Sequence, residues 1–128
     1  MPTKKDITPE GASLLAAALA EVRPAYVGLL RDLELDWPGS RALLARLGVA
    51  LAAQDPEGAH VVLGKCLSGG LGAYRAARRA RIGDQARFAA FVAGITEALA
   101  ESHQQALVTD ALSTLQERAL RLAGEGDG

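Results

Sequence analysis

The sequence contains few of the residues that stabilise secreted or β-rich domains. Its 128 residues include one cysteine and five aromatic side chains. A single cysteine excludes an intrachain disulfide, and a shortage of aromatic and β-branched residues argues against a sheet. The apolar residues make up 49% of the chain and are mainly Ala, Leu and Val, which suit closely packed helices. The length predicts one domain with a core that folds without disulfides or metal.

Long hydrophobic runs are also absent, since no apolar stretch approaches the ~20 residues of a membrane span. A lysine pair followed by an alanine-rich run near the N-terminus loosely resembles a signal peptide, but Asp6 and Glu10 interrupt it. Thr8 is a good N-cap and Pro9 suits the first helical position, so a capped helix explains this segment better. We therefore predict a cytoplasmic protein with no membrane contact.

No catalytic, metal or nucleotide motif is present. His60 and His103 have no second ligand at helical spacing. The glycine-rich stretch 68–72 lacks the Lys-Ser/Thr ending and the preceding strand of a P-loop, although a helix start there could hold a single phosphate. Glu97 and Glu101 are the nearest carboxylate pair, a spacing typical of a solvated helix face. We predict no enzyme activity, no cofactor and no metal.

Proline, glycine and capping residues divide the chain into six to seven predicted helices. The predicted segments are 8–22, 24–35, 40–53, 55–67 and 71–82, followed by one long helix or a helix pair over 84–123. We favour the pair, because the polar residues 101–105 separate two apolar stripes. The expected fold is all-α, a single-domain antiparallel helical bundle, with the helical domain at 8–123. Residues 1–7 are expected to be flexible and 124–128 to be a disordered tail.

Several single residues carry structural predictions. Ser40, Asp55 and Asp84 are the predicted N-caps of the helices that follow them. Trp37 precedes a Pro-Gly pair and is expected to fold under the loop and cap the bundle. The alternative for Trp37 is an exposed anchor for a partner. Cys66 lies in an apolar run and is expected to be a buried small hydrophobe.

Basic residues are concentrated in one part of a chain whose formal net charge is −1. Residues 65–87 hold six basic side chains and one acidic one, so this segment carries about +5 and the remainder about −6. Such a segment is the part of the chain that would attract an anionic partner. The candidate binding residues are Lys65, Tyr74, Arg75, Arg78, Arg79, Arg81 and Arg87.

A helical projection gathers part of this charge on one face. At 100° per residue, Arg75, Arg78 and Arg79 fall within roughly 100° of one another, and Tyr74 and Arg81 widen that face. Four alanines, at positions 73, 76, 77 and 80, gather on the opposite side. We expect the alanine face to pack against a neighbouring helix and the arginine face to point outward, because buried unpaired guanidinium groups are costly.

Three alternatives remain open for the arginine face. Its arginines could pair with acids on neighbouring helices, for which Asp32, Glu34 and Asp36 form a counterpart. They could meet an acidic surface of a protein partner. They could also bind nucleic-acid phosphate, with Tyr74 stacking on a base, although dedicated nucleic-acid binders are usually basic overall.

The sequence therefore predicts a non-enzymatic helical interaction or assembly protein that acts through protein–protein contacts, as a subunit, adaptor or regulator. Self-association, most simply as a homodimer, is expected because the apolar stripes of the last forty residues exceed what one small bundle covers. The alternative is a nucleic-acid-binding accessory protein that uses the Arg75, Arg78 and Arg79 face.

Overall fold

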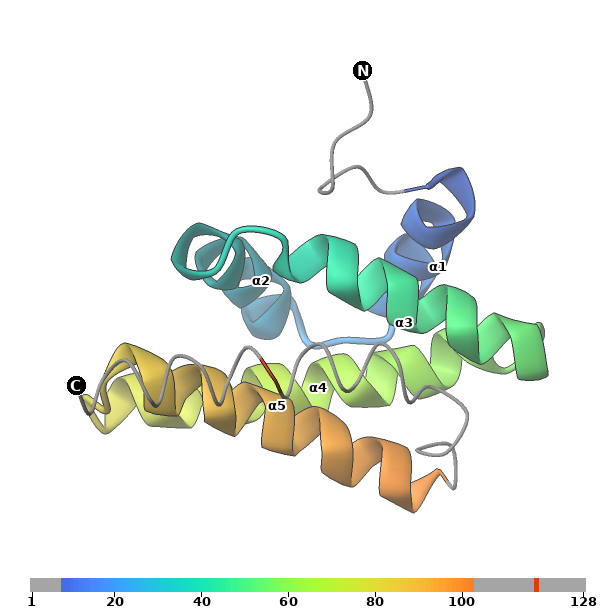
Figure 1. The fold of residues 1–128 in the computed structure, drawn as a ribbon. Coiled ribbons are helices and arrows are strands. Elements are labelled where there is room, and N and C mark those ends of the chain that lie inside the picture. Colours follow the sequence, from blue (N-terminus) through green and yellow to red (C-terminus); the bar gives the residue numbers. More distant parts are fainter. Residues whose placement is uncertain (1–7, 103–116, 118–128) are drawn as a thin grey trace.

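A computed structural model describes residues 8–102 and Glu117, and residues 8–102 contain five α-helices and no strand (Figure 1). The helices are α1 (Pro9–Leu19), α2 (Pro24–Asp36), α3 (Ser40–Gln54), α4 (Ala59–Arg79) and α5 (Asp84–Glu101). The all-α prediction is confirmed for this part of the chain. The predictions for residues 1–7, for a helix after 102 and for a tail at 124–128 lie outside the described residues.

The central element is α4, which packs against each of the other four helices. Its most extensive contact is with α5, which returns antiparallel beside it after a short connection (Figure 1). The helices α1, α2 and α3 lie together on one side of the α4–α5 pair. One long helix therefore connects both parts of the bundle, and every surface near α4 is built from its neighbours as well.

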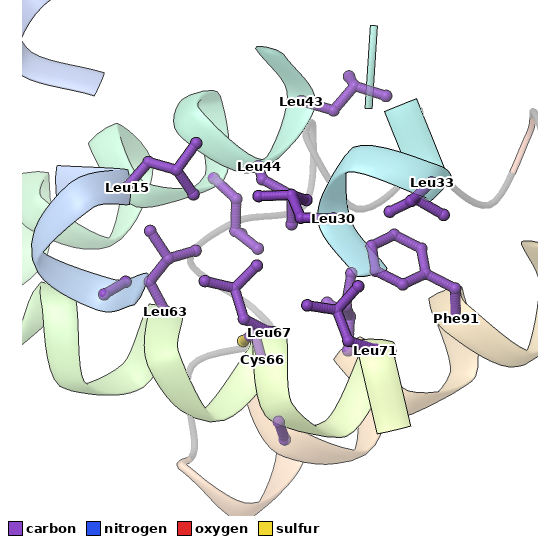
Figure 2. Packing of buried hydrophobic residues seen from close by; sticks show 14 of the residues in the cluster. Leu15, Leu30, Leu33, Leu43, Leu44, Leu63, Cys66, Leu67, Leu71 and Phe91 are labelled. Atoms are coloured by element: carbon purple, nitrogen blue, oxygen red, sulfur yellow. The ribbon is translucent and has the colours of Figure 1, made fainter. Parts of the chain in front are cut away.

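Leucines spaced one helical turn apart form the core. Leu63, Leu67 and Leu71 are fully buried on α4 and point into the space between α1, α2 and α3 (Figure 2). They meet buried leucines from the other helices, Leu15, Leu30, Leu33, Leu44 and Leu47. An i, i+4 spacing places side chains on the same helix face. Each fully buried leucine contributes roughly 1.5–3 kcal/mol relative to an exposed one, so this stripe fixes which face of α4 points inward.

The predicted break at residues 68–70 was wrong, because α4 runs through it without interruption. The glycines there allow a close helix crossing instead of a turn. A Cβ atom on Gly69 would lie 2.8 Å from the Gly94 carbonyl oxygen of α5, and one on Gly70 would lie 2.9 Å from the Phe91 ring. Gly in a helix interior costs roughly 1 kcal/mol relative to Ala, and the backbone contact with α5 offsets that cost.

The start of α4 also differs from the prediction. The helix begins at Ala59, whereas we predicted a cap at Asp55. The Asp55 carboxylate accepts a hydrogen bond of 3.1 Å from the Gly58 amide, three residues on. Asp55 therefore closes a turn that precedes the helix.

Two other helix ends follow the sequence closely. The Thr8 hydroxyl accepts a hydrogen bond of 3.1 Å from the Gly11 amide, which confirms Thr8 as the N-cap of α1. The prediction of Asp84 as an N-cap was wrong, because Gly83 holds the N-cap position of α5 and Asp84 is the first residue of the helix. The helix α5 ends at Glu101, the first residue of the polar stretch where we expected a helix to stop.

The corner between α2 and α3 is held by Glu34, which the sequence predicted as part of the acidic counterpart of the arginine face. The Glu34 carboxylate accepts hydrogen bonds of 2.8 Å from the amides of Gly39 and Arg41. Gly39 adopts φ 98°, a left-handed conformation that favours glycine. Ser40 is the first residue of α3 and its hydroxyl donates to the Trp37 carbonyl. The prediction of Ser40 as N-cap was wrong, and Glu34 satisfies the amides at this helix end instead.

Candidate functional site

Trp37 positions the aromatic residues beneath the candidate site. Its ring is buried and lies 5.6 Å from the Tyr74 ring and 4.8 Å from the Phe88 ring, measured between centroids. This confirms the prediction that Trp37 folds under its loop. The cluster joins α4 and α5 to the end of α2 and leaves no room for Trp37 to act as an exposed anchor.

Tyr74 belongs to this core and not to the surface. Its side chain is fully buried, and its hydroxyl donates a hydrogen bond of 2.7 Å to the Asp36 carboxylate. Burial, and then the hydrogen bond to Asp36, raise the pKa of the Tyr74 hydroxyl well above its ordinary value. The suggestion that Tyr74 stacks on a nucleic-acid base does not hold, because the ring is not accessible.

Two of the candidate arginines pair with acids of α2. Arg78 lies 2.7 Å from the Asp32 carboxylate, and Arg87 lies 3.4 Å from the Asp36 carboxylate. The hydrogen bond that the Arg78 guanidinium donates to Asp32 raises the pKa of Arg78. The Arg78–Asp32 pair is more than 40% exposed on both sides, so it contributes only about 0–1 kcal/mol. These two arginines follow the first alternative, in which the arginine face is neutralised within the chain.

Arg75 and Arg79 form no ion pair with any residue that the structure describes. The Arg75 guanidinium lies 5.9 Å from the centre of the Tyr26 ring, and the Arg23 guanidinium lies 5.8 Å from it. Tyr26 is half-buried on α2 and its hydroxyl oxygen lies beside Gly72 of α4. Cation–π contacts of this kind contribute about 0.5–1 kcal/mol at exposed sites and leave the guanidinium donors free for other partners.

Tyr26, Arg75 and Arg79 also line an open groove of about 480 Å³ between α2 and α4. Its lining residues are Tyr26, Gly72, Arg75, Ala76, Arg79 and Ala80. We name Arg23, Tyr26, Arg75 and Arg79 the basic end of α4. The groove has a floor of small residues and a rim of guanidinium groups, which is an arrangement suited to an anionic segment.

The alanine face does not pack as predicted. Ala76 and Ala80 are exposed and line the groove, and of the four alanines only Ala77 is buried. The inward face of this part of α4 is formed by Gly70, Tyr74 and Ala77, at spacings of four and three. The helical projection was wrong because the buried ring of Tyr74, and not the small alanine side chains, determines which face of α4 points inward.

The remaining candidate residues lie elsewhere. Lys65 lines a second open groove, of about 560 Å³, together with Glu21, Glu97 and Glu101. Arg81 follows the end of α4 with φ 59°, so it leaves the helix and does not widen its face. The seven predicted residues therefore fall at several separate places, and only Arg75 and Arg79 belong to the basic end.

The sequence analysis missed Arg23 and Tyr26. They precede the arginine cluster by some fifty residues, and only the packing of α2 on α4 brings them together. Arg23 is the N-cap residue of α2 and its backbone is not helical, so helical spacing gives no local signal that would link it to Tyr26.

The described part of the chain shows no candidate metal site, no reactive thiol and no membrane-spanning helix. No group of three or more His, Cys, Asp or Glu side chains is placed to hold a metal among these residues. Cys66 is buried, and burial raises the pKa of its thiol to about 12, so the reactive thiolate is suppressed. None of the described helices is long and apolar enough to cross a membrane.

No known protein family, characterised protein or solved structure matches this chain.

Proposed function

We propose that this protein is a non-enzymatic interaction protein that binds an acidic segment of a protein partner at the basic end of α4. The observation that carries the proposal is the difference between neighbouring arginines. Arg78 and Arg87 are paired with acids of α2, whereas Arg75 and Arg79 have no such pair among the described residues and face an open groove. Guanidinium groups without an ion pair are suited to binding carboxylates in a bidentate manner.

The shape of the groove favours a peptide. Gly72, Ala76 and Ala80 present little side-chain bulk, so a partner backbone can approach α4 closely. Tyr26 already has two guanidinium groups near its ring, which leaves it a poor platform for a base. With Tyr74 buried, the basic end has no other aromatic ring to stack on a nucleotide. A nucleic acid would therefore gain phosphate contacts but no stacking, and we treat it as the competing outcome.

The test compares two anionic probes of equal charge, a polyglutamate peptide and a single-stranded oligonucleotide, by fluorescence anisotropy. We expect the peptide to bind more tightly and its affinity to fall with salt. Reversing Arg75→Glu and Arg79→Glu should weaken binding by about tenfold or more, the equivalent of about 1.4 kcal/mol. Arg41→Glu/Arg46→Glu is the matched control, because both side chains are exposed on α3, neither lines the groove and the change in charge is the same.

Each other result is decisive. Tighter binding of the oligonucleotide, lost in the same double variant, would replace the proposal with the nucleic-acid alternative. Failure of both probes to bind at low salt would remove the basic end as an interaction surface.

A further inference from the structure

The basic end of α4 is one half of a longer exposed stripe along the same helix. Residues spaced alternately by four and three lie on one face, and each of them is exposed or half-buried. They are Val61, Lys65, Ser68, Gly72, Arg75 and Arg79. At 1.5 Å per residue the stripe is about 27 Å long, and both open grooves lie along it.

The other half of the stripe is lined by acids from the neighbouring helices. Glu21 follows α1 on one flank, and its Cβ would lie 3.3 Å from a Cβ on Gly64. Glu97 and Glu101 of α5 form the opposite flank of the same groove. We name Glu21, Glu97, Glu101 and Lys65 the acidic end of α4, and Lys65 is the one base among the described residues that line this groove.

The two ends carry opposite charge at opposite ends of one helix face. The basic end contributes three guanidinium groups, and the acidic end contributes three carboxylates and one ammonium group. Between them Ser68, Gly69 and Gly72 keep the middle of the stripe shallow. Such a surface is complementary to a copy of itself turned end for end, because each basic end then meets an acidic end.

We infer that two copies of this protein pair antiparallel along the α4 stripe, related by a two-fold axis near Ser68 and Gly72. This inference rests on the proposed function, since it names the acidic partner of the basic end as the acidic end of a second copy. A two-fold axis makes the same contact twice, which is the commonest symmetry of soluble oligomers. A parallel arrangement would place like charges together and is disfavoured.

The test uses charge reversal on the full chain. The variant Arg75→Glu/Arg79→Glu makes the basic end net acidic, and the variant Glu97→Lys/Glu101→Lys makes the acidic end net basic, so in each variant both ends of the stripe carry the same sign of net charge. Sedimentation velocity should show a dimer for the wild type that weakens with salt. Each variant alone should be monomeric, with dimerisation weakened by about tenfold or more. An equimolar mixture of the two variants should form a heterodimer, because both contacts are then complementary.

A matched control keeps the result specific. The variant Arg46→Glu/Arg41→Glu changes as much charge on exposed positions of α3 and should dimerise like the wild type. Circular dichroism of every variant checks that helix content is unchanged.

Two results would overturn the inference, and two further results would show what binds the stripe of a monomeric wild type. A wild type that stays monomeric at low salt removes the dimer. Variants that remain dimeric place the interface on another face. A monomeric wild type whose reversal variants unfold at lower temperature shows that a segment of the same chain occupies the stripe. Polyglutamate binding by a monomeric wild type, lost on reversal of Arg75 and Arg79, would leave the proposed function standing while this inference fails.

Discussion

The hydroxyl of Tyr74 donates a hydrogen bond of 2.7 Å to the carboxylate of Asp36. The bond joins α4 to the last residue of α2, across 38 positions of sequence. Tyr74 directly precedes Arg75, so the rotation of α4 that buries this ring also directs Arg75 towards Tyr26. The sequence placed Tyr74 among the candidate binding residues, but its buried side chain packs beneath that surface and fixes the position of α4.

Removing that hydroxyl should destabilise the fold without creating a cavity. Tyr74→Phe leaves the Asp36 carboxylate with Arg87 but without its buried donor. We expect a loss of roughly 1.5–3 kcal/mol in the free energy of unfolding, the range for hydrogen bonds to charged groups. Urea unfolding measures it, with Tyr26→Phe as the control, since no hydrogen bond of its hydroxyl is found among the described residues. Equal loss in both variants would contradict the role of Asp36.

The helix positions were largely predictable because their signals are local. Thr8 with Pro9 and the Pro24 start were read correctly from capping chemistry. The continuity of α4 could not be predicted, because a pair of glycines such as Gly69 and Gly70 occurs both in loops and in close helix–helix crossings. Only the partner, Gly94 on α5, decides between the two, and its position depends on tertiary packing.

The candidate site was predictable only in part, for a related reason. Clustering in sequence identified Arg75 and Arg79, but it could not separate them from Arg78, whose partner Asp32 lies 46 positions away. The helical projection was wrong because it turned the alanines inward and grouped Tyr74 with the exposed arginines, whereas the Tyr74 ring is buried. Tyr74 can be buried because its hydroxyl group donates a hydrogen bond to the Asp36 carboxylate.

Adding one methyl group between α4 and α5 at their crossing should strongly destabilise the protein. A Cβ on Gly94 would lie 2.8 Å from the Gly70 Cα atom and closer still to the backbone of Gly69, and neither can move without separating the helices. Gly94→Ala should therefore cost about 3 kcal/mol or more, as overpacking against backbone does. Gly28→Ala is the control, because its Cβ would meet nothing within 4 Å and should stabilise α2 by about 0.5–1 kcal/mol.

The pair of variants is measured by thermal unfolding followed by circular dichroism. An unchanged melting temperature for Gly94→Ala would show that α4 and α5 do not approach as closely as described.

Arg81→Gly should stabilise the protein. Arg81 occupies the left-handed position after α4, and the Ile82 amide donates to the Ala77 carbonyl across it. This is the position where glycine avoids a Cβ penalty, so we expect a gain of about 0.5–1 kcal/mol in unfolding free energy. Because Arg81 lies beyond the helix, polyglutamate affinity should stay within about twofold of wild type. A large loss of affinity would return Arg81 to the binding surface.

Stability should decline at alkaline pH through the buried thiol. The pKa of Cys66 is about 12 in the folded chain, against 9.0 for an exposed thiol, so unfolding releases a proton between these values. The stability that comes from keeping Cys66 protonated is fully present below about pH 9. Above that pH the free energy of unfolding decreases by up to about 1.4 kcal/mol per pH unit. Tyr74, whose pKa is also raised, acts in the same direction above about pH 10.

Urea unfolding at about pH 8 and about pH 10.5 measures whether the free energy of unfolding decreases as the pH rises. Cys66→Ala lowers stability at both values by removing buried volume, but the difference between the two pH values should shrink. An unchanged difference would assign the alkaline loss to other groups.

Glu34 has a consequence for the order in which the chain folds. Its two amide partners, Gly39 and Arg41, lie five and seven residues away, so the α2–α3 corner closes with little loss of chain entropy. Contacts of short sequence separation form fastest. The corner is therefore the natural early structure, and α4, whose contacts reach every other helix, completes the core only afterwards.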